Sequence, residues 1–341
     1  MKILKYLLLL VLIVFIGGAI YLATLDGNYD IQRSKVINAP IGLVYNKVND
    51  YKAWETWSPW LYKDPNTKLT YGDITSGSGA SYSWESENEE VGAGRMETVD
   101  AVANESLNQQ ITFIEPWEQQ SDIYWTFKPA EGGGTEVTWG LKGEMPFMAR
   151  YMAAKMDEYV SPDYEKGLAK LDSVIQLDMK KYSIKVDGET THSGGYYLYN
   201  TTSCKIDEMP DKMAEMMPKV GAYAMNNKIT MAGPAFSLYH KWDQENNAVI
   251  FSCAVPVVDR VITERDSGIQ TGMLKPFKAL KTTLTGNYDN LAEAWTMAEK
   301  YIADNNLVEI NGHPALEVYA NDPMEYPNPA DWVTEIYIPI K

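Results

Sequence analysis

Histidine and cysteine are scarce in this chain, and each shortage excludes a kind of site. The 341 residues include 3 His and 2 Cys. His192, His240 and His313 stand singly and far apart, so neither a zinc site nor a Ser-His-Asp triad is expected. We therefore predict no metal site and no cofactor. Cys204 and Cys253 form no C-x-x-C pair, and their spacing leaves open whether they form a disulfide.

Basic residues are also in deficit. The chain has 30 Lys and Arg against 46 Asp and Glu, a formal net charge of −16. A surface of this sign repels phosphate backbones, so nucleic acid is not an expected partner. Hydrophobic residues make up 45% and charged residues 22%, which is typical of globular protein. The length is sufficient for two domains with separate cores.

Charge is absent from residues 6–25, YLLLLVLIVFIGGAIYLATL. At about 1.5 Å per residue, this run spans roughly 30 Å, the thickness of the hydrocarbon core of a bilayer. A cleaved signal peptide is the alternative, but the run is long and Tyr21-Leu22-Ala23 is a poor cleavage site. We predict a transmembrane anchor over residues 1–27.

The charges that flank this run predict its orientation. Lys2 and Lys5 precede the run, and Asp26 and Asp30 follow it. The positive-inside rule then places the N-terminus in the cytoplasm. The rest of the single-pass protein is expected outside the cytoplasm, in the periplasm if the cell is Gram-negative.

Residues 28–177 have the pattern of an antiparallel sheet and a long helix. A strand-like run, 31–40, is followed by helical spacing from Ile41. Clusters such as SGSG (76–79) separate six further strand-like runs, which are 68–72, 80–86, 94–102, 106–114, 121–129 and 135–143. A helix from Met145 to Gln176 is predicted to close the domain.

This domain resembles the SRPBCC superfamily of polyketide-cyclase and START-like helix-grip proteins. The residues that carry the resemblance are INAP (37–40), Asn49-Asp50, WETWSPW (54–60) and PDYEKGLAKL (162–171). The resemblance implies a curved sheet around a helix, but it does not specify a chemistry. Trp54, Trp57 and Trp60 could line a ligand cavity or simply pack in the core.

Residues 180–341 contain an internal repeat. PAFSLYH (234–240) aligns with PALEVYA (314–320), and each is followed by a second strand that contains proline. Each is also preceded by a stretch with helical spacing, 208–226 and 288–305. Two β-α-β-β halves of this kind would form one pseudo-symmetric sheet with a groove between the halves. The whole chain is thus predicted to be α+β: a transmembrane helix, a helix-grip antiparallel sheet domain and this tandem β-α-β-β domain.

The repeat domain resembles the GyrI-like family, which also supplies the effector-binding domains of AraC-type and MerR-type regulators. The matching runs are GPAFSLYHKWD (233–243), AVPV (254–257), TLTGNYDNLAEAWTMAEKYI (283–302), LEVYANDP (316–323) and TEIYIPIK (334–341). The resemblance implies a small-molecule site, in which a glutamate at the last motif commonly faces the ligand. No helix-turn-helix adjoins the domain here, so direct control of transcription is not expected.

The last strand suggests which carboxylate this is. A two-residue period puts Glu335 and Tyr337 on one face and Thr334, Ile336 and Ile338 on the other. The apolar face suits the helices, so Glu335 is expected to face the groove beside an aromatic ring. A carboxylate in such a site is costly unless it is paired, and a bound cation would pair with it. The other predicted wall residues, which could add cation–π attraction, are Tyr239, Trp242, Trp295 and Tyr319.

The sequence favours a membrane-anchored protein that binds hydrophobic or amphipathic small molecules, cationic ones included, as a sensor or scavenger. Two alternatives stay open. In the first, the protein is a hydrolase of electrophilic small molecules, with Glu335 as the catalytic acid–base group and Tyr337 beside it. In the second, the protein is a structural or partner-binding module. The sequence alone does not decide whether the chain is an enzyme.

Overall fold

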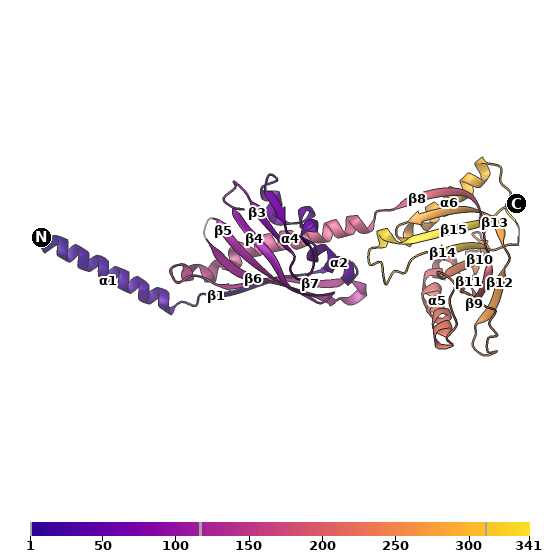
Figure 1. Cartoon of the computed structure of the whole chain (residues 1–341), viewed down its shortest axis with the longest axis horizontal. Helices are drawn as coiled ribbons and strands as arrows, with labels where there is room; N and C mark the ends of the chain where they lie inside the picture. The colour runs from indigo at the N-terminus through magenta and orange to yellow at the C-terminus, as the bar shows by residue number, and fades with distance from the viewer. Residues whose placement is uncertain (1, 116–117, 311) are drawn as a thin grey trace. The chain divides into compact units, whose positions relative to one another are not determined.

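The computed structural model describes residues 2–115, 118–310 and 312–341, which form two compact units, Met1–Leu177 and Asp178–Lys341. The chain begins with α1 (Lys2–Thr24) (Figure 1). The stretch Leu4–Thr24 has a mean hydropathy of 2.7 and none of it is buried in the protein. By length and composition it is able to cross a membrane, although a signal sequence would meet the same criteria.

The first unit is a seven-stranded antiparallel sheet with the strand order β1-β7-β6-β5-β4-β3-β2 (Figure 1). Its strands are β1 (Asn28–Ile37), β2 (Lys68–Tyr71), β3 (Ser81–Glu85), β4 (Ala93–Val102), β5 (Ser106–Glu115), β6 (Gln119–Pro129) and β7 (Thr135–Glu144). Its helical segments are α2 (Ile41–Asn49), η1 (Tyr51–Thr56), α3 (Pro59–Lys63), η2 (Glu131–Gly133), η3 (Phe147–Lys155) and α4 (Met156–Met179). This is the predicted helix-grip arrangement of a sheet and a long C-terminal helix.

The predicted closing helix is in part wrong. Residues 147–155 wind as the 3₁₀ segment η3, and the α-helix begins only at Met156. Apolar spacing does not separate 3₁₀ from α winding over a short stretch, because both repeat after three to four residues. The acidic side chains Asp157 and Glu158 lie in the first turn of α4, where the helix dipole favours negative charge.

Aromatic rings fill the space between the first sheet and α4. Trp54, Trp57, Trp125 and Trp139 are each at most 2% exposed. The Trp139 ring stacks on Trp125 with centroids 4.5 Å apart, and on the other side it stacks on Tyr164 of α4 at 3.9 Å. The choice that the sequence left open is therefore decided for Trp54 and Trp57, which belong to a packed core rather than to an open cavity wall.

The second unit is an eight-stranded sheet with the order β12-β9-β11-β10-β14-β15-β13-β8 (Figure 1). Its strands are β8 (Ser183–His192), β9 (Gly195–Cys204), β10 (Phe236–Asp243), β11 (Ala248–Val257), β12 (Gln270–Leu274), β13 (Phe277–Thr285), β14 (Ala315–Tyr319) and β15 (Val333–Pro339). Its helical segments are η4 (Ile206–Glu208), α5 (Met209–Asn226), η5 (Tyr288–Asn290), α6 (Leu291–Asp304) and η6 (Pro329–Asp331).

The predicted tandem halves are present in this sheet. One half is β9-α5-β10-β11 and the other is β13-α6-β14-β15, while β8 and β12 are additional strands at the two edges. The halves join where β10 pairs with β14, and Ser237 lies opposite Glu317 in this register. These two residues occupy equivalent positions in the sequence repeat, so Glu317 lies close to the pseudo-symmetry axis.

Both helices lie against the same face of the second sheet. Val220 and Ala224 of α5 pack on Leu198 and Val255 of the first half. In the second half, Leu280, Leu284, Ile336 and Ile338 pack on three buried residues of α6, which are Ala294, Ala298 and Ile302. The other face of the sheet has an apolar core of its own. The two helices therefore leave between them a stretch of sheet that is formed by β10 and β14.

Candidate functional site

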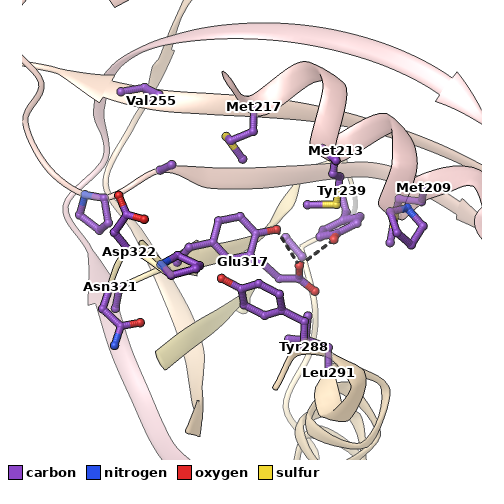
Figure 2. Close-up of a pocket in the computed structure, with 18 of the residues that line it drawn as sticks. Met209, Met213, Met217, Tyr239, Val255, Tyr288, Leu291, Glu317, Asn321 and Asp322 are labelled. Carbon is purple, nitrogen blue, oxygen red and sulfur yellow. Dashed lines mark hydrogen bonds between the residues drawn. The ribbon is translucent and has the colours of Figure 1, made fainter. Parts of the chain in front are cut away.

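A groove of about 2090 Å³ lies between α5 and α6 (Figure 2). Its floor is formed by side chains of β10 and β14, its walls come from the two helices, and a loop over residues 320–326 borders it. Residues that line it from α5 include Met209, Met213 and Met217, and those from η5 and α6 include Tyr288, Leu291 and Trp295. The groove exceeds the roughly 300–1,000 Å³ of ordinary ligand pockets, so it has room for a drug-sized molecule.

Glu317 is the carboxylate in the floor of this groove. Its side chain accepts a hydrogen bond from the Tyr239 hydroxyl at 2.7 Å (Figure 2). It also accepts hydrogen bonds from Trp295 Nε1 at 2.5 Å and from the Tyr319 hydroxyl at 3.2 Å. The donors come from α6, β10 and β14, so the carboxylate joins both halves of the domain. The Tyr319 hydroxyl also shares a hydrogen bond of 3.0 Å with Ser237. Glu317 itself is only 3% exposed.

The partners of Glu317 are neutral. Burial raises the pKa of its carboxyl above the ordinary value, and the hydrogen bonds from Trp295, Tyr239 and Tyr319 oppose this shift. Burial and the nearby carboxylate also raise the pKa values of the Tyr239 and Tyr319 hydroxyls well above their usual range. Both tyrosines therefore stay protonated and act as hydrogen-bond donors. A buried carboxylate whose partners among the described residues are all neutral is a site at which a cation would be stabilised.

Aromatic rings surround the carboxylate. Tyr239 and Trp295 meet edge to face with centroids 5.8 Å apart, and Tyr288 and Tyr319 do so at 5.6 Å. The faces of such rings attract organic cations. The thioethers of α5 complete the opposite wall, and methionine adapts its shape to different ligands.

Two family models match the chain, one on each folded unit. Residues 196–341 match the model of the GyrI-like small molecule binding domain, and residues 29–176 match that of polyketide cyclase / dehydrase and lipid transport proteins. The chain contains one domain of each family. The predicted resemblances are thereby confirmed, and the groove belongs to the GyrI-like domain. No curated protein matches the chain.

Solved structures that are similar to the chain share little sequence with it. The crystal structure of the EcmrR C-terminal domain is 18% identical, with a TM-score of 0.40, and the match covers 47% of this chain and 98% of that one. Protein MLL2253 from Mesorhizobium loti is 14% identical, with a TM-score of 0.34 over 43% of this chain and 97% of its own. The Aha1 dimer from Colwellia psychrerythraea is 14% identical, with a TM-score of 0.31 over 42% and 94%.

The structure gathers most of the predicted site residues at the groove of the GyrI-like domain. Tyr239, Trp242, Trp295 and Tyr319 all line it. Trp242 lies at its rim, where its side chain is half exposed and its ring is 6.1 Å from that of Tyr239. The predicted aromatic walls thus come from β10, α6 and β14.

Glu335 and Tyr337 are not among the residues that line the groove. Glu335 accepts hydrogen bonds from Lys281 Nζ and from the Tyr337 hydroxyl, both at 2.7 Å. Glu335 does face away from Ile336 and from the helices, as its place in the strand predicted. The expected position in the groove is nevertheless wrong, because the groove lies on the helix-covered face, between the helices. Lys281 supplies the counter-charge that a ligand was expected to supply.

Glu317 and Tyr288 are among the groove residues that the sequence reasoning missed. A signal for Glu317 was present, because LEVYA alternates apolar Leu316 and Val318 with polar Glu317 and Tyr319. The repeat reinforces this signal, because Ser237 and Tyr239 occupy the equivalent positions of PAFSLYH, and Ser237 lies opposite Glu317 in the sheet. For Tyr288 there is no comparable signal, because it lies in the short turn before α6 and its place depends on how that turn folds over the sheet.

Proposed function

We propose that this protein is a membrane-anchored binding protein for hydrophobic or amphipathic organic cations, which it senses or scavenges outside the cytoplasm. The GyrI-like groove holds the ligand. The observation that carries this proposal is the buried carboxylate of Glu317, whose partners in the described part of the chain are neutral donors and which lies in a groove walled by aromatic rings and thioethers.

The cationic character of the ligand follows from the chemistry of the groove floor. An ammonium or other organic cation would provide the positive counter-charge that the Glu317 carboxylate lacks. Tyr239 and Trp295 would present the surfaces of their rings beside this cation. The apolar body of the ligand would lie along the methionines of α5. An anion would be repelled, and a neutral ligand would gain the apolar contacts but not the ion pair.

The location of the binding site relative to the membrane is also part of the proposal. Helix α1 is proposed to remain as a single-pass anchor through residues 6–25, with the N-terminus in the cytoplasm. The two folded units then lie on the opposite side, which is the periplasmic side in a Gram-negative cell. A site so placed meets amphipathic molecules as they reach or leave the bilayer.

The hydrolase alternative remains open, but its catalytic group changes. Glu335 is paired with Lys281 outside the groove, whereas Glu317 has a pKa raised by burial and two tyrosine hydroxyls within hydrogen-bond distance. A carboxyl group of this kind is able to act as a general acid–base group on an electrophilic ligand. A hydrolase would consume its ligand with time, whereas a binding protein returns it unchanged.

The test is equilibrium dialysis of the full-length protein in detergent against a panel of organic cations and their neutral isosteres. The bound molecules are then recovered and weighed by mass spectrometry. Glu317→Gln is the informative variant, and Glu335→Gln is the matched control because it changes a carboxylate outside the groove. The proposal expects cations to bind the wild type and the control, to bind Glu317→Gln weakly, and to be recovered intact. If the panel does not bind at all, the partner-binding module is favoured.

A further inference from the structure

The segment that links β7 to α4 exposes apolar side chains on the first unit. In η3 (Phe147–Lys155), the side chains of Phe147, Met148 and Tyr151 are 42%, 65% and 56% exposed. A 3₁₀ helix has three residues per turn, so Met148 and Tyr151 project on the same side. Ala153 of the same segment is buried against the unit. The segment thus packs through Ala153, while Met148 and Tyr151 are exposed on another side. Phe147, at the start of the row that leads to Ala153, is also partly exposed, and we call Phe147, Met148 and Tyr151 together the η3 surface.

The η3 surface is held close to the end of α1. The backbone N–H of Met145 donates to the carbonyl of Gly27 at 2.8 Å. A Cβ atom at Gly27 would lie 3.1 Å from the Met145 carbonyl oxygen and 3.2 Å from Arg150, so the two segments touch. Helix α1 ends at Thr24, three residues before Gly27. Three residues reach at most about 11 Å, whichever way α1 points.

We propose that the η3 surface is a second membrane contact, which rests in the headgroup region of the bilayer that α1 crosses. This inference depends on the proposed anchoring by α1. Amphipathic aromatic and apolar side chains next to the end of a transmembrane helix partition into the membrane interface. The bilayer is the apolar medium that the short connection to α1 necessarily brings within reach of Phe147, Met148 and Tyr151.

The charges around this surface indicate which lipids it would meet. From Met145 to Met156 the chain carries only basic charges, Arg150 and Lys155, although its net charge is −16. Arg150 is paired with Glu144 at 3.1 Å and lies over the Phe147 ring at 5.6 Å. With one of its two cations already paired, the surface has little net positive charge. The contact is therefore driven by apolar burial, requires no anionic lipid and depends weakly on salt.

The inference is tested on the full-length protein in phosphatidylcholine vesicles by spin labelling. Cys204→Ser leaves Cys253, which is fully buried, as the remaining cysteine. Nitroxide labels are then placed singly at Met148→Cys and, in case that variant is unstable, at Tyr151→Cys. The accessibility of each label to oxygen, which concentrates in lipid, is compared with its accessibility to a water-soluble nickel chelate.

Two control positions separate the possible outcomes. Val102 is an exposed apolar residue at the other end of the first sheet, about one strand length of 30 Å from the end that carries η3. Val11 lies within the candidate span. We expect lipid-like accessibility at residues 11, 148 and 151 and water-like accessibility at 102. If residue 11 is in lipid but 148 and 151 report water, the inference is overturned while the anchor stands. If residue 11 itself reports water, the proposed anchoring fails, and the inference fails with it.

Discussion

Replacing Glu317 by Gln should weaken the binding of organic cations far more than that of neutral molecules of the same shape. The substitution keeps the size of the side chain and removes its charge. Because Glu317 is 3% exposed and its partners are neutral, solvent screens it little. Loss of one partner of a buried, hydrogen-bonded charge pair costs about 2–5 kcal/mol. The groove is open to solvent on one side, so we expect the lower part of this range, about 2–3 kcal/mol, or roughly a 30- to 150-fold rise in Kd.

Isothermal titration calorimetry with a quaternary ammonium ligand and its neutral carbon isostere measures this difference directly. A thermal-shift assay gives a second readout. A ligand at 100 times its Kd stabilises the native state by about 2.7 kcal/mol, and a hundredfold weaker affinity at the same concentration lowers this to about 0.4 kcal/mol. The control Glu335→Gln should bind the cation like the wild type, because Glu335 pairs with Lys281 outside the groove.

Several results would refute this reasoning. If Glu317→Gln binds the cation as tightly as the wild type does, the buried carboxylate is not the ligand's counter-charge. If the variant loses the neutral isostere and the cation equally, the substitution has disturbed the shape of the groove rather than its charge. If Glu335→Gln weakens cation binding as much as Glu317→Gln does, the loss is not specific to the carboxylate in the groove.

Three further predictions concern pH, the first core and the cysteines. Burial raises the pKa of Glu317 above 4.5, so the affinity for a permanently charged cation should increase as the pH rises from about 4.5 through the raised pKa. Over the same window the stability of the wild type should fall relative to Glu317→Gln, because the unfolded chain loses this proton more readily. Ligand titrations and thermal melts at stepped pH measure the two effects. Trp139→Ala should lower the free energy of unfolding of the first unit by about 3–5 kcal/mol, because it empties a fully buried site between two stacked rings. Urea denaturation measures this loss, and a value below about 1 kcal/mol would contradict the packed core. Reductant should leave the melting temperature unchanged, because Cys204 and Cys253 are free. Cys204 lies opposite Val249, four residues before Cys253 on the neighbouring strand, so the two cysteines are about 13 Å apart along the strands, too far for a disulfide.

Much of the fold could be predicted from the sequence because it depends on local patterns. The turn clusters between the strands of the first unit give the meander, and the repeated PAFSLYH and PALEVYA runs give the two halves of the second sheet. The edge strands β8 and β12 were not predicted. β8 is placed by pairing with β13, and β12 by pairing with β9. The periodicity of a single strand does not specify its pairing partner.

The site shows the same division between local and long-range information. The two-residue period assigned Glu335 to the correct face of its strand, as the burial of Thr334 and Ile336 confirms. The period does not tell which face carries the groove, because that depends on how far apart α5 and α6 pack. Glu317 was missed for this reason. Its place beneath the helices follows from a register, Glu317 opposite Ser237 and Ile336, that only the assembled sheet reveals.

The central claim is that the groove between α5 and α6 holds an organic cation on Glu317. The most direct measurement is a crystal structure of the protein with a quaternary ammonium ligand that carries bromine, located by its anomalous signal. The account predicts the cationic head in contact with the Glu317 carboxylate, next to Tyr239 and Trp295, and the brominated body along the α5 methionines. Anomalous density beside Glu335, or within the first unit with an empty GyrI-like groove, would contradict it.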